Sequence, residues 1–203
     1  MSEAWKRGLL RAVAFPREPR TVVKFGGSLL LRPTWPAELR GIVANCTGPT
    51  TVVVGGGPVV DGLRTIDAAG SADNAAMHRL AIDALAITAR LAAEMTGLRL
   101  ASAPADAGGG VILDTPAWLV ESGRLASLPA GWHVTSDSIA ATVAVAAAAG
   151  LLLVKSVPPP PVAGDLATLA DHGWVDDHFP VAAATLGRIE WAAPAMLSPR
   201  SSR

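Results

Sequence analysis

The chain has 203 residues, in which 17 lysines and arginines balance 17 aspartates and glutamates, so the formal net charge is zero. This balance argues against nucleic acid or an anionic membrane as a partner, since both attract proteins with excess positive charge. Half of the residues are apolar and only 17% are charged, which predicts a large core or a face buried against another copy. The single cysteine, Cys46, excludes an intrachain disulfide and a cysteine-based zinc site, and we expect a reducing, cytoplasmic location.

The first twenty residues mix basic and apolar side chains and also contain Glu3 and Glu18. A targeting peptide would show a long apolar stretch and a small-residue cleavage site, and this segment shows neither. We therefore expect a loosely ordered N-terminal arm or short surface helix over 1–20, followed by a single domain over 21–203.

Two apolar strands that run into glycines open the domain. The strand Thr21–Phe25 leads into Gly26, Gly27 and Ser28, and the strand Thr50–Val54 leads into three more glycines and Pro58. The unbroken β-branched run of the second strand is typical of a parallel sheet buried on both faces. Apolar residues at helical spacing predict one helix over 37–46, and Pro58 suits the first turn of another that continues over 59–69.

The remaining elements alternate in the same way. Ser71 or Asp73 is expected to cap a long helix to about residue 95, and helices of this length often lie at subunit interfaces. Short strands are predicted over 98–101 and 111–113, and a helix follows with Thr115 as its cap. An alanine-rich helix over 138–149 precedes a strand over 151–154, which prolines 158–161 terminate. A helical turn over 165–170, a polar turn over 175–180 and a last strand over 188–192 complete an α/β fold whose mainly parallel sheet is sandwiched by helices.

The glycine loops and the lysines indicate phosphate binding. Backbone N–H groups approach ligands closely at the carboxyl ends of parallel strands, where glycines leave room. The chain has 14 arginines but only three lysines, and two of these, Lys24 and Lys155, stand at or just after the ends of apolar strands. Lysine commonly serves as a point charge on phosphate. Neither the Walker pattern nor G-x-G-x-x-G is present, so the two commonest phosphate-loop folds are not predicted.

Three motifs, in this order, resemble the amino acid kinase family, which includes acetylglutamate, aspartate and bacterial uridylate kinases. They are Val23-Lys24-Phe25-Gly26-Gly27-Ser28, Val54-Gly55-Gly56-Gly57-Pro58 and Ser136-Asp137-Ser138-Ile139-Ala140-Ala141. The resemblance spans about 22–157 and implies a three-layer kinase fold that uses ATP and Mg²⁺. The apolar composition and the long helix, in turn, favour a homo-oligomer.

The resemblance also implies roles for individual residues. The nucleotide phosphates would lie against Lys24, Gly26, Gly27, Ser28 and Ser156. The acceptor would be held by Gly55, Gly56, Gly57, Pro58, Asp61 and Ser136. Asp137 would orient the catalytic Lys24, although a plain helix N-cap is its alternative interpretation.

The chain departs from the family after its later strand. Lys155-Ser156-Val157-Pro158 replaces the usual Thr/Ser-Asp or Thr-Lys, valine and Asp-Gly, which implies a truncated nucleotide subdomain. Several members place a second catalytic lysine there, and Lys155 or Arg188 is the candidate replacement. A metal site built from His172, Asp176, Asp177 and His178 is conceivable, but a surface turn is favoured, and no metal ligand is predicted.

The residues therefore predict an ATP-dependent phosphotransferase acting on a small phosphate- or carboxylate-bearing acceptor. The short length and the closing segment 173–180 are most similar to small kinases that convert an aminomethylfuran-methyl phosphate to its diphosphate, on the route to methanofuran-type cofactors. Two alternatives stay open. The chain would be either a nucleotide- or oxyanion-binding storage protein without turnover, or a regulatory subunit of another kinase.

Overall fold

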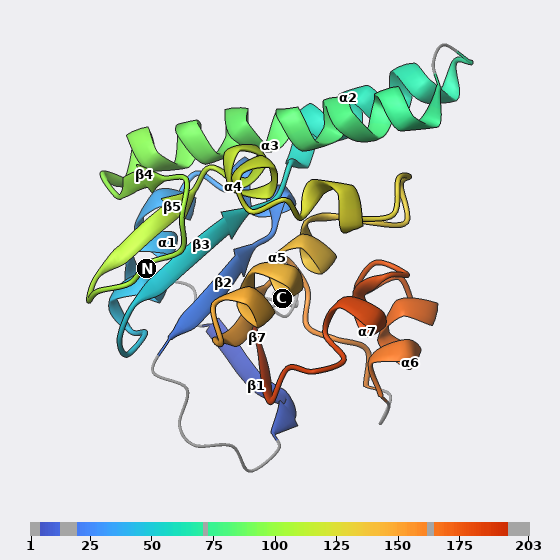
Figure 1. The fold of residues 1–203 in the computed structure, drawn as a ribbon. Helices are drawn as coiled ribbons and strands as arrows, with labels where there is room; N and C mark the ends of the chain where they lie inside the picture. The colour runs from blue at the N-terminus through green and yellow to red at the C-terminus, as the bar shows by residue number, and fades with distance from the viewer. Residues whose placement is uncertain (1–4, 13–19, 71–72, 162–164, 195–203) are drawn as a thin grey trace, which may run out of the picture.

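A single twisted sheet of seven strands organises the part of the chain that the computed structural model describes, residues 5–12, 20–70, 73–161 and 165–194 (Figure 1). The strand order is β1-β7-β6-β2-β3-β5-β4. The strands are β1 (Trp5–Ala12), β2 (Thr21–Phe25), β3 (Thr50–Val54), β4 (Arg99–Ala101), β5 (Gly110–Leu113), β6 (Gly150–Val154) and β7 (Arg188–Pro194). All neighbouring pairs are parallel except β1 and β7.

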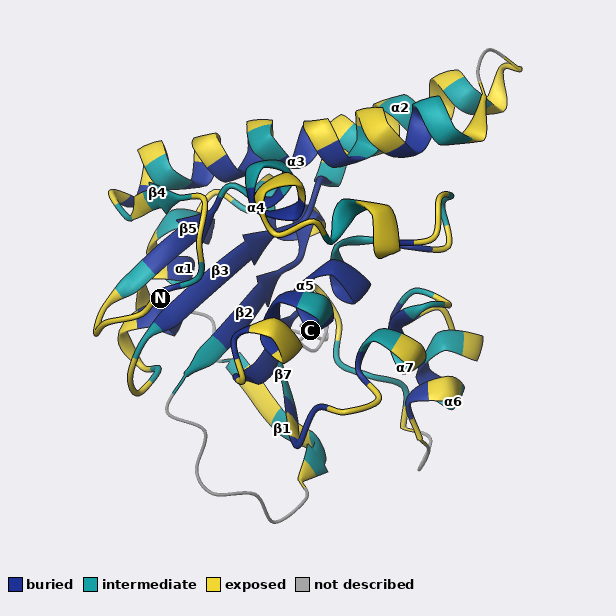
Figure 2. Ribbon diagram, viewed as in Figure 1, coloured by how far each residue is buried: buried dark blue, intermediate teal, exposed yellow. Residues whose placement is uncertain are grey.

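Helices cover both faces of this sheet (Figure 1). On one side lie α1 (Trp35–Ala44) and α3 (Asn74–Thr96), and on the other lie α5 (Ser136–Ala146), α6 (Leu166–Asp171) and α7 (Phe179–Ala182). The hairpin of α2 (Gly57–Ala68) and α3 projects beyond the body of the molecule, and Figure 2 shows that its outer part is largely exposed. The shorter elements are α4 (Thr115–Glu121) and the 3₁₀ turns η1 (Gly27–Leu31) and η2 (Leu125–Ser127). The predicted α/β sandwich is therefore confirmed.

Side chains alternate between the two faces along each central strand, as the pleat requires. Val22 and Val53 belong to the core under α5, whereas Val23 and Val52 belong to the core under α1 and α3. This alternation matters for the site because Lys24 shares the face of Val22. Lys24 is therefore directed toward α5.

The N-terminal prediction is wrong for the described residues 5–12. They form neither a loose arm nor a helix but the strand β1, which pairs antiparallel with β7 from Trp5 opposite Pro194 to Ala12 opposite Arg188. The pairing partner, β7, lies at the far end of the sequence, so no local sequence pattern predicts the strand β1. Residues 1–4 and 13–19 lie outside the described part of the chain.

Capping side chains confirm one expected helix start and move two others. Asp73 caps α3, as one alternative predicted. The cap of α4 is Asp114 rather than Thr115. The alanine-rich helix α5 begins at Ser136 with Thr135 as its N-cap, so the interpretation of Asp137 as the N-cap is wrong. Asp137 lies inside the first turn. Among the helices of the described residues, none combines the length and apolar character that crossing a membrane requires.

Candidate functional site

The carboxyl ends of three adjacent strands meet at one edge of the sheet. Phe25 of β2 lies opposite Val54 of β3 and Val154 of β6. The next residues continue this alignment, because the Gly26 amide donates to the Val154 carbonyl at 2.8 Å and the Gly55 amide donates to the Phe25 carbonyl at 2.8 Å. The two glycine loops and the residue after β6 therefore start side by side.

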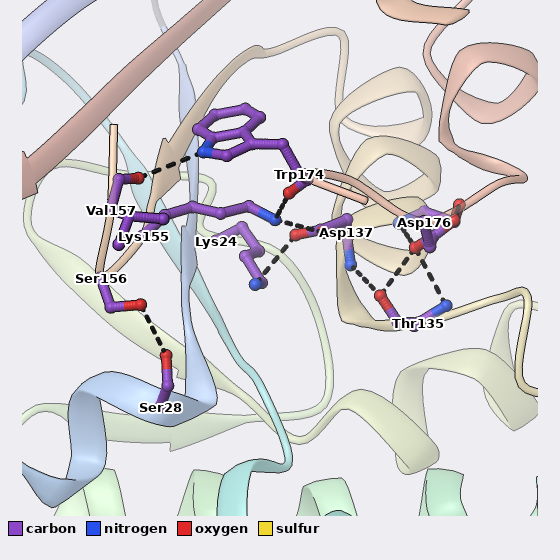
Figure 3. A network of polar contacts seen from close by, with 10 residues as sticks. Lys24, Ser28, Thr135, Asp137, Lys155, Ser156, Val157, Trp174 and Asp176 are labelled. Atoms are coloured by element: carbon purple, nitrogen blue, oxygen red, sulfur yellow. Dashed lines mark hydrogen bonds and ion pairs between the residues drawn. The ribbon is translucent and has the colours of Figure 1, made fainter. Parts of the chain in front are cut away.

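Two lysines converge on one aspartate at this edge (Figure 3). Lys24 Nζ lies 2.9 Å from Asp137 Oδ1, and Lys155 Nζ donates to Asp137 Oδ2 at 2.6 Å. The first contact is an ion pair without the angles of a hydrogen bond. Strand alternation places both lysines on the α5 face, and the first turn of α5 presents Asp137 between them. All three side chains are largely buried, with exposed fractions of 7%, 6% and 13% for Lys24, Asp137 and Lys155.

The shared burial changes how these groups titrate. Burial by itself raises the pKa of Asp137, but Lys24 and Lys155 lower that pKa more, so the carboxyl stays ionised. Burial lowers the pKa of Lys155, and the charge of Lys24 lowers it further. Contacts with Asp137 offset part of this effect, so the pKa of Lys155 lies at about 8. Two cations thus share one anion, which leaves a net positive charge at neutral pH.

The glycine loops contact each other backbone to backbone. A Cβ on Gly27 would lie 2.6 Å from Gly57 Cα and 2.9 Å from the carbonyl carbon of Gly55, both backbone atoms that cannot move aside. Gly57 itself has a φ of +50°, a conformation that L side chains rarely adopt. The helix α2 starts at this residue, so the amides of its first turn lack intrahelical partners.

A cavity of about 400 Å³ opens beside these groups. Its walls come from both glycine loops, the α2–α3 hairpin, the segment before α5 and the segment before α7. Of the predicted site residues, the cavity is lined by Gly27, Ser28, Gly56, Gly57, Asp61, Ser136, Asp137 and Lys155. The site thus combines a positive charge with a close approach to backbone amides, which suits a phosphorylated ligand.

Five other predicted residues are near the cavity but not in its lining. Lys24 lies behind Asp137, and Gly26 and Gly55 form the backbone links between strands. Pro58 lies in the first turn of α2. Ser156 is exposed and accepts a hydrogen bond from Ser28 Oγ at 3.2 Å. Lys155, rather than Lys24, is therefore the lysine that faces the cavity.

Arg188 is not a candidate for the second lysine's role. It begins β7 next to the amino end of β6, because Ile189 lies opposite Leu151. Lys155 is at the other end of β6. Arg188 pairs instead with Glu190 at 2.9 Å, in a separate cavity that also contains Arg7 and Arg20.

The conceivable metal cluster over 172–178 does not form. His172 contacts the Thr168 carbonyl, while Asp176 accepts hydrogen bonds from Thr135 and Ser138. Within the described residues, no three His, Cys, Asp or Glu side chains are grouped as a metal site.

Several lining residues were not predicted from the sequence. Trp174 contacts Lys155, Trp132 donates to Asp67 at 2.7 Å, and His78 on α3 has a buried Nε2 without a hydrogen-bond partner in the described structure. A threonine before an apolar helical run is a recognisable cap signal, so Thr135 could have been found. Nothing local marks Trp174, Trp132 or His78, because only tertiary contacts bring them to the cavity.

The sequence matches no protein-family model and no curated protein. The predicted fold is confirmed, because it matches that of a solved structure. That structure is the uridylate kinase from Archaeoglobus fulgidus, with a TM-score of 0.54 and 18% sequence identity over 87% of this chain and 90% of the other. A likeness at this identity shows a shared fold and carries no information about substrate.

Proposed function

We propose that this protein is a kinase that transfers a phosphoryl group from ATP to a small phosphorylated acceptor. The observation that carries the proposal is the Lys24–Asp137–Lys155 cluster beside the two glycine loops, at the carboxyl edge of a kinase-like sheet. Phosphoryl transfer needs alignment of the two phosphates and neutralisation of their charge, and little covalent participation by the protein.

Each group has a place in that reaction. Lys155 is the cavity-facing cation and would contact the transferring phosphoryl oxygens. Asp137 holds the Lys155 ammonium group in place. Lys24 adds positive charge on the other oxygen of Asp137. The amides of the η1 and α2 first turns would bind phosphate oxygens. Losing one such electrostatic contact commonly lowers the rate by ~10²–10³-fold.

The described residues fit ATP phosphates better than they fit a protein-held metal ion. Both Asp137 oxygens face lysine ammonium groups. Mg²⁺, which kinases of this kind usually take from solution with the nucleotide, would therefore be held by phosphate oxygens and water. It would neutralise phosphate charge, and the residues described above would align the phosphates.

For the acceptor, we propose a small molecule with one phosphate, since the cavity is modest in size and the Lys155 ammonium lies in its lining beside the glycine loops. The specific candidate is the aminomethylfuran-methyl phosphate implied by the sequence resemblance. That choice rests on the sequence motifs alone.

The test is ADP release from MgATP in the presence of a panel of acceptors that includes aminomethylfuran-methyl phosphate. We expect acceptor-dependent ADP release, and its loss in Lys155→Ala and Lys24→Ala. The third lysine offers a matched control, because Lys6 lies exposed on β1, and Lys6→Ala should retain full turnover. Normal turnover in both site variants would refute the proposal.

A binding or storage protein on the same fold is the second candidate. The observation that favours it is that Asp176 and Thr135 already occupy amides at the start of α5, which makes that helix end less available to phosphate. Nucleotide binding by calorimetry with no phosphorylated product from any acceptor would support this alternative.

A further inference from the structure

Trp174 contacts Lys155 twice and is itself held by a hydrogen bond to Val157 (Figure 3). The Lys155 ammonium donates a hydrogen bond to the Trp174 carbonyl, and its nitrogen lies 4.9 Å from the centroid of the Trp174 ring. The indole Nε1 donates to the Val157 carbonyl at 3.1 Å, which fixes the ring against the chain just beyond Lys155. The aromatic face and the carbonyl dipole both stabilise the charged ammonium.

Two residues further on, Asp176 holds the beginning of α5. Its Oδ2 accepts hydrogen bonds from the Thr135 amide at 3.0 Å, the Thr135 hydroxyl at 2.7 Å and the Ser138 amide at 3.0 Å. Its Oδ1 accepts a hydrogen bond from the Ser138 hydroxyl. Asp137 stands between these two anchored residues, so its backbone is fixed from both sides.

We propose that the segment 174–176 is the positioning element of the site, with Trp174 setting Lys155 and Asp176 setting the turn that carries Asp137. Trp174, at one end of the segment, thus positions Lys155, and Asp176, at the other end, positions Asp137. The catalytic meaning of this inference rests on the proposed function, but the positioning itself is testable without turnover.

The chain's three lysines make a direct test possible. Lysine labelled with ¹³C at Cε should give one NMR signal each for Lys6, Lys24 and Lys155, and titration of these signals reports the local charge state. The charged and titratable groups around Lys155 are Lys24, Asp137 and Asp176. In the unaltered protein we expect the Lys155 signal to titrate near pH 8.

Trp174→Leu removes a ring contact that favours the ammonium, but it also admits water to a group whose pKa is lowered mainly by burial. The gain in hydration is the larger effect, so the Lys155 signal should titrate at clearly higher pH, closer to the ordinary value of 10.5. Trp174→Phe keeps an aromatic face and the backbone carbonyl, and should largely restore the original midpoint. An unchanged midpoint in folded Trp174→Leu would overturn the role of Trp174.

Asp176→Asn tests the other end of the segment and does not depend on replacing a buried tryptophan. It removes the charge and weakens the four hydrogen bonds, so the start of α5 should loosen and the signals of both Lys24 and Lys155 should shift. Asp171→Asn is the matched control, because Asp171 is an exposed aspartate at the end of α6. Lysine signals in Asp176→Asn identical to those of the control would refute the proposal.

Kinetics then separate this inference from the proposed function. If the protein is a kinase, Asp176→Asn should lower kcat by about 10²-fold, since small displacements of reacting groups cost this much, while the KM for ATP changes little. If no acceptor is phosphorylated by the unaltered protein, the proposed function fails, and the NMR shifts still decide the positioning role.

Discussion

Lys155 differs from an ordinary lysine because it is buried near another cation. Burial and then the charge of Lys24 lower the pKa of Lys155 to about 8, and the shared Asp137 offsets part of this shift. The ammonium is charged below this pH and loses its proton above it. At the scale of single residues, the site is therefore most cationic in neutral or acidic solution.

The first prediction concerns pH. Turnover of the unaltered protein should decline as pH rises through about 8, because the Lys155 cation that would face the phosphoryl group is lost. Lys155→Arg stays charged throughout this range, so whatever activity it retains should lack the decline. The measurement is kcat/KM from pH 6 to 10. A flat profile for the unaltered protein would contradict the assigned role of Lys155.

At the scale of elements, the glycine loops have a packing role as well as a proposed binding role. The loop after β2 contacts the loop after β3 so closely that a side chain at Gly27 has no space. By contrast, a Cβ on the exposed Gly62 of α2 would meet no atom within 4 Å. Similar glycines in the sequence thus serve different physical purposes.

The second prediction compares these two glycines. Gly27→Ala should destabilise the protein by about 1–3 kcal/mol through overpacking against backbone, whereas Gly62→Ala should stabilise it by about 0.5–1 kcal/mol because alanine favours a helix interior. Urea denaturation of both variants provides the measurement. Equal stability of the two would show that the loops are looser than described.

The third prediction concerns the exposed side of α3. A row of large apolar side chains lies there, comprising Leu80, Ile87, Leu91 and Met95 with exposed fractions of 48%, 58%, 45% and 51%. Several large apolar side chains exposed along one helix often mark a contact with another chain. We expect the protein to form a homo-oligomer through this face, and Ile87→Lys with Leu91→Glu to reduce its mass in light scattering. Val181→Lys, at an exposed position on α7, is the control. A monomeric unaltered protein would contradict this expectation.

At the scale of the whole molecule, β1 joins the two ends of the described chain. It covers the edge of β7. Gly8 has no side chain, and the Trp191 indole occupies the space that a side chain there would take. β7 in turn supports the site, because the Lys155 amide donates to the Ala192 carbonyl at 2.9 Å. The N-terminal strand β1 therefore contacts β7, and β7 contacts the backbone of the cavity residue Lys155.

The fourth prediction is that deleting residues 1–12 lowers the melting temperature and promotes aggregation, because the edge of β7 becomes unpaired. Leu9→Ser should have little effect, since the Leu9 side chain is 57% exposed. Thermal unfolding followed by circular dichroism, with light scattering, measures both effects. A deletion variant as stable and monodisperse as the control would show that β1 is dispensable.

The amino-acid sequence by itself determined the central strands, the glycine turns at their ends and the lysines placed beside them. These features are local, because strand alternation, β-branched runs and glycine turns act over a few residues. The sequence resemblance already implied that Asp137 orients Lys24. The tertiary structure alone decided that Asp137 also pairs with Lys155, that Lys155 rather than Arg188 completes the cluster, and that Trp174 and Asp176 hold it. It also decided that residues 5–12 form a strand. Each of these depends on partners far apart in the chain, whose meeting is fixed only when the whole core has packed.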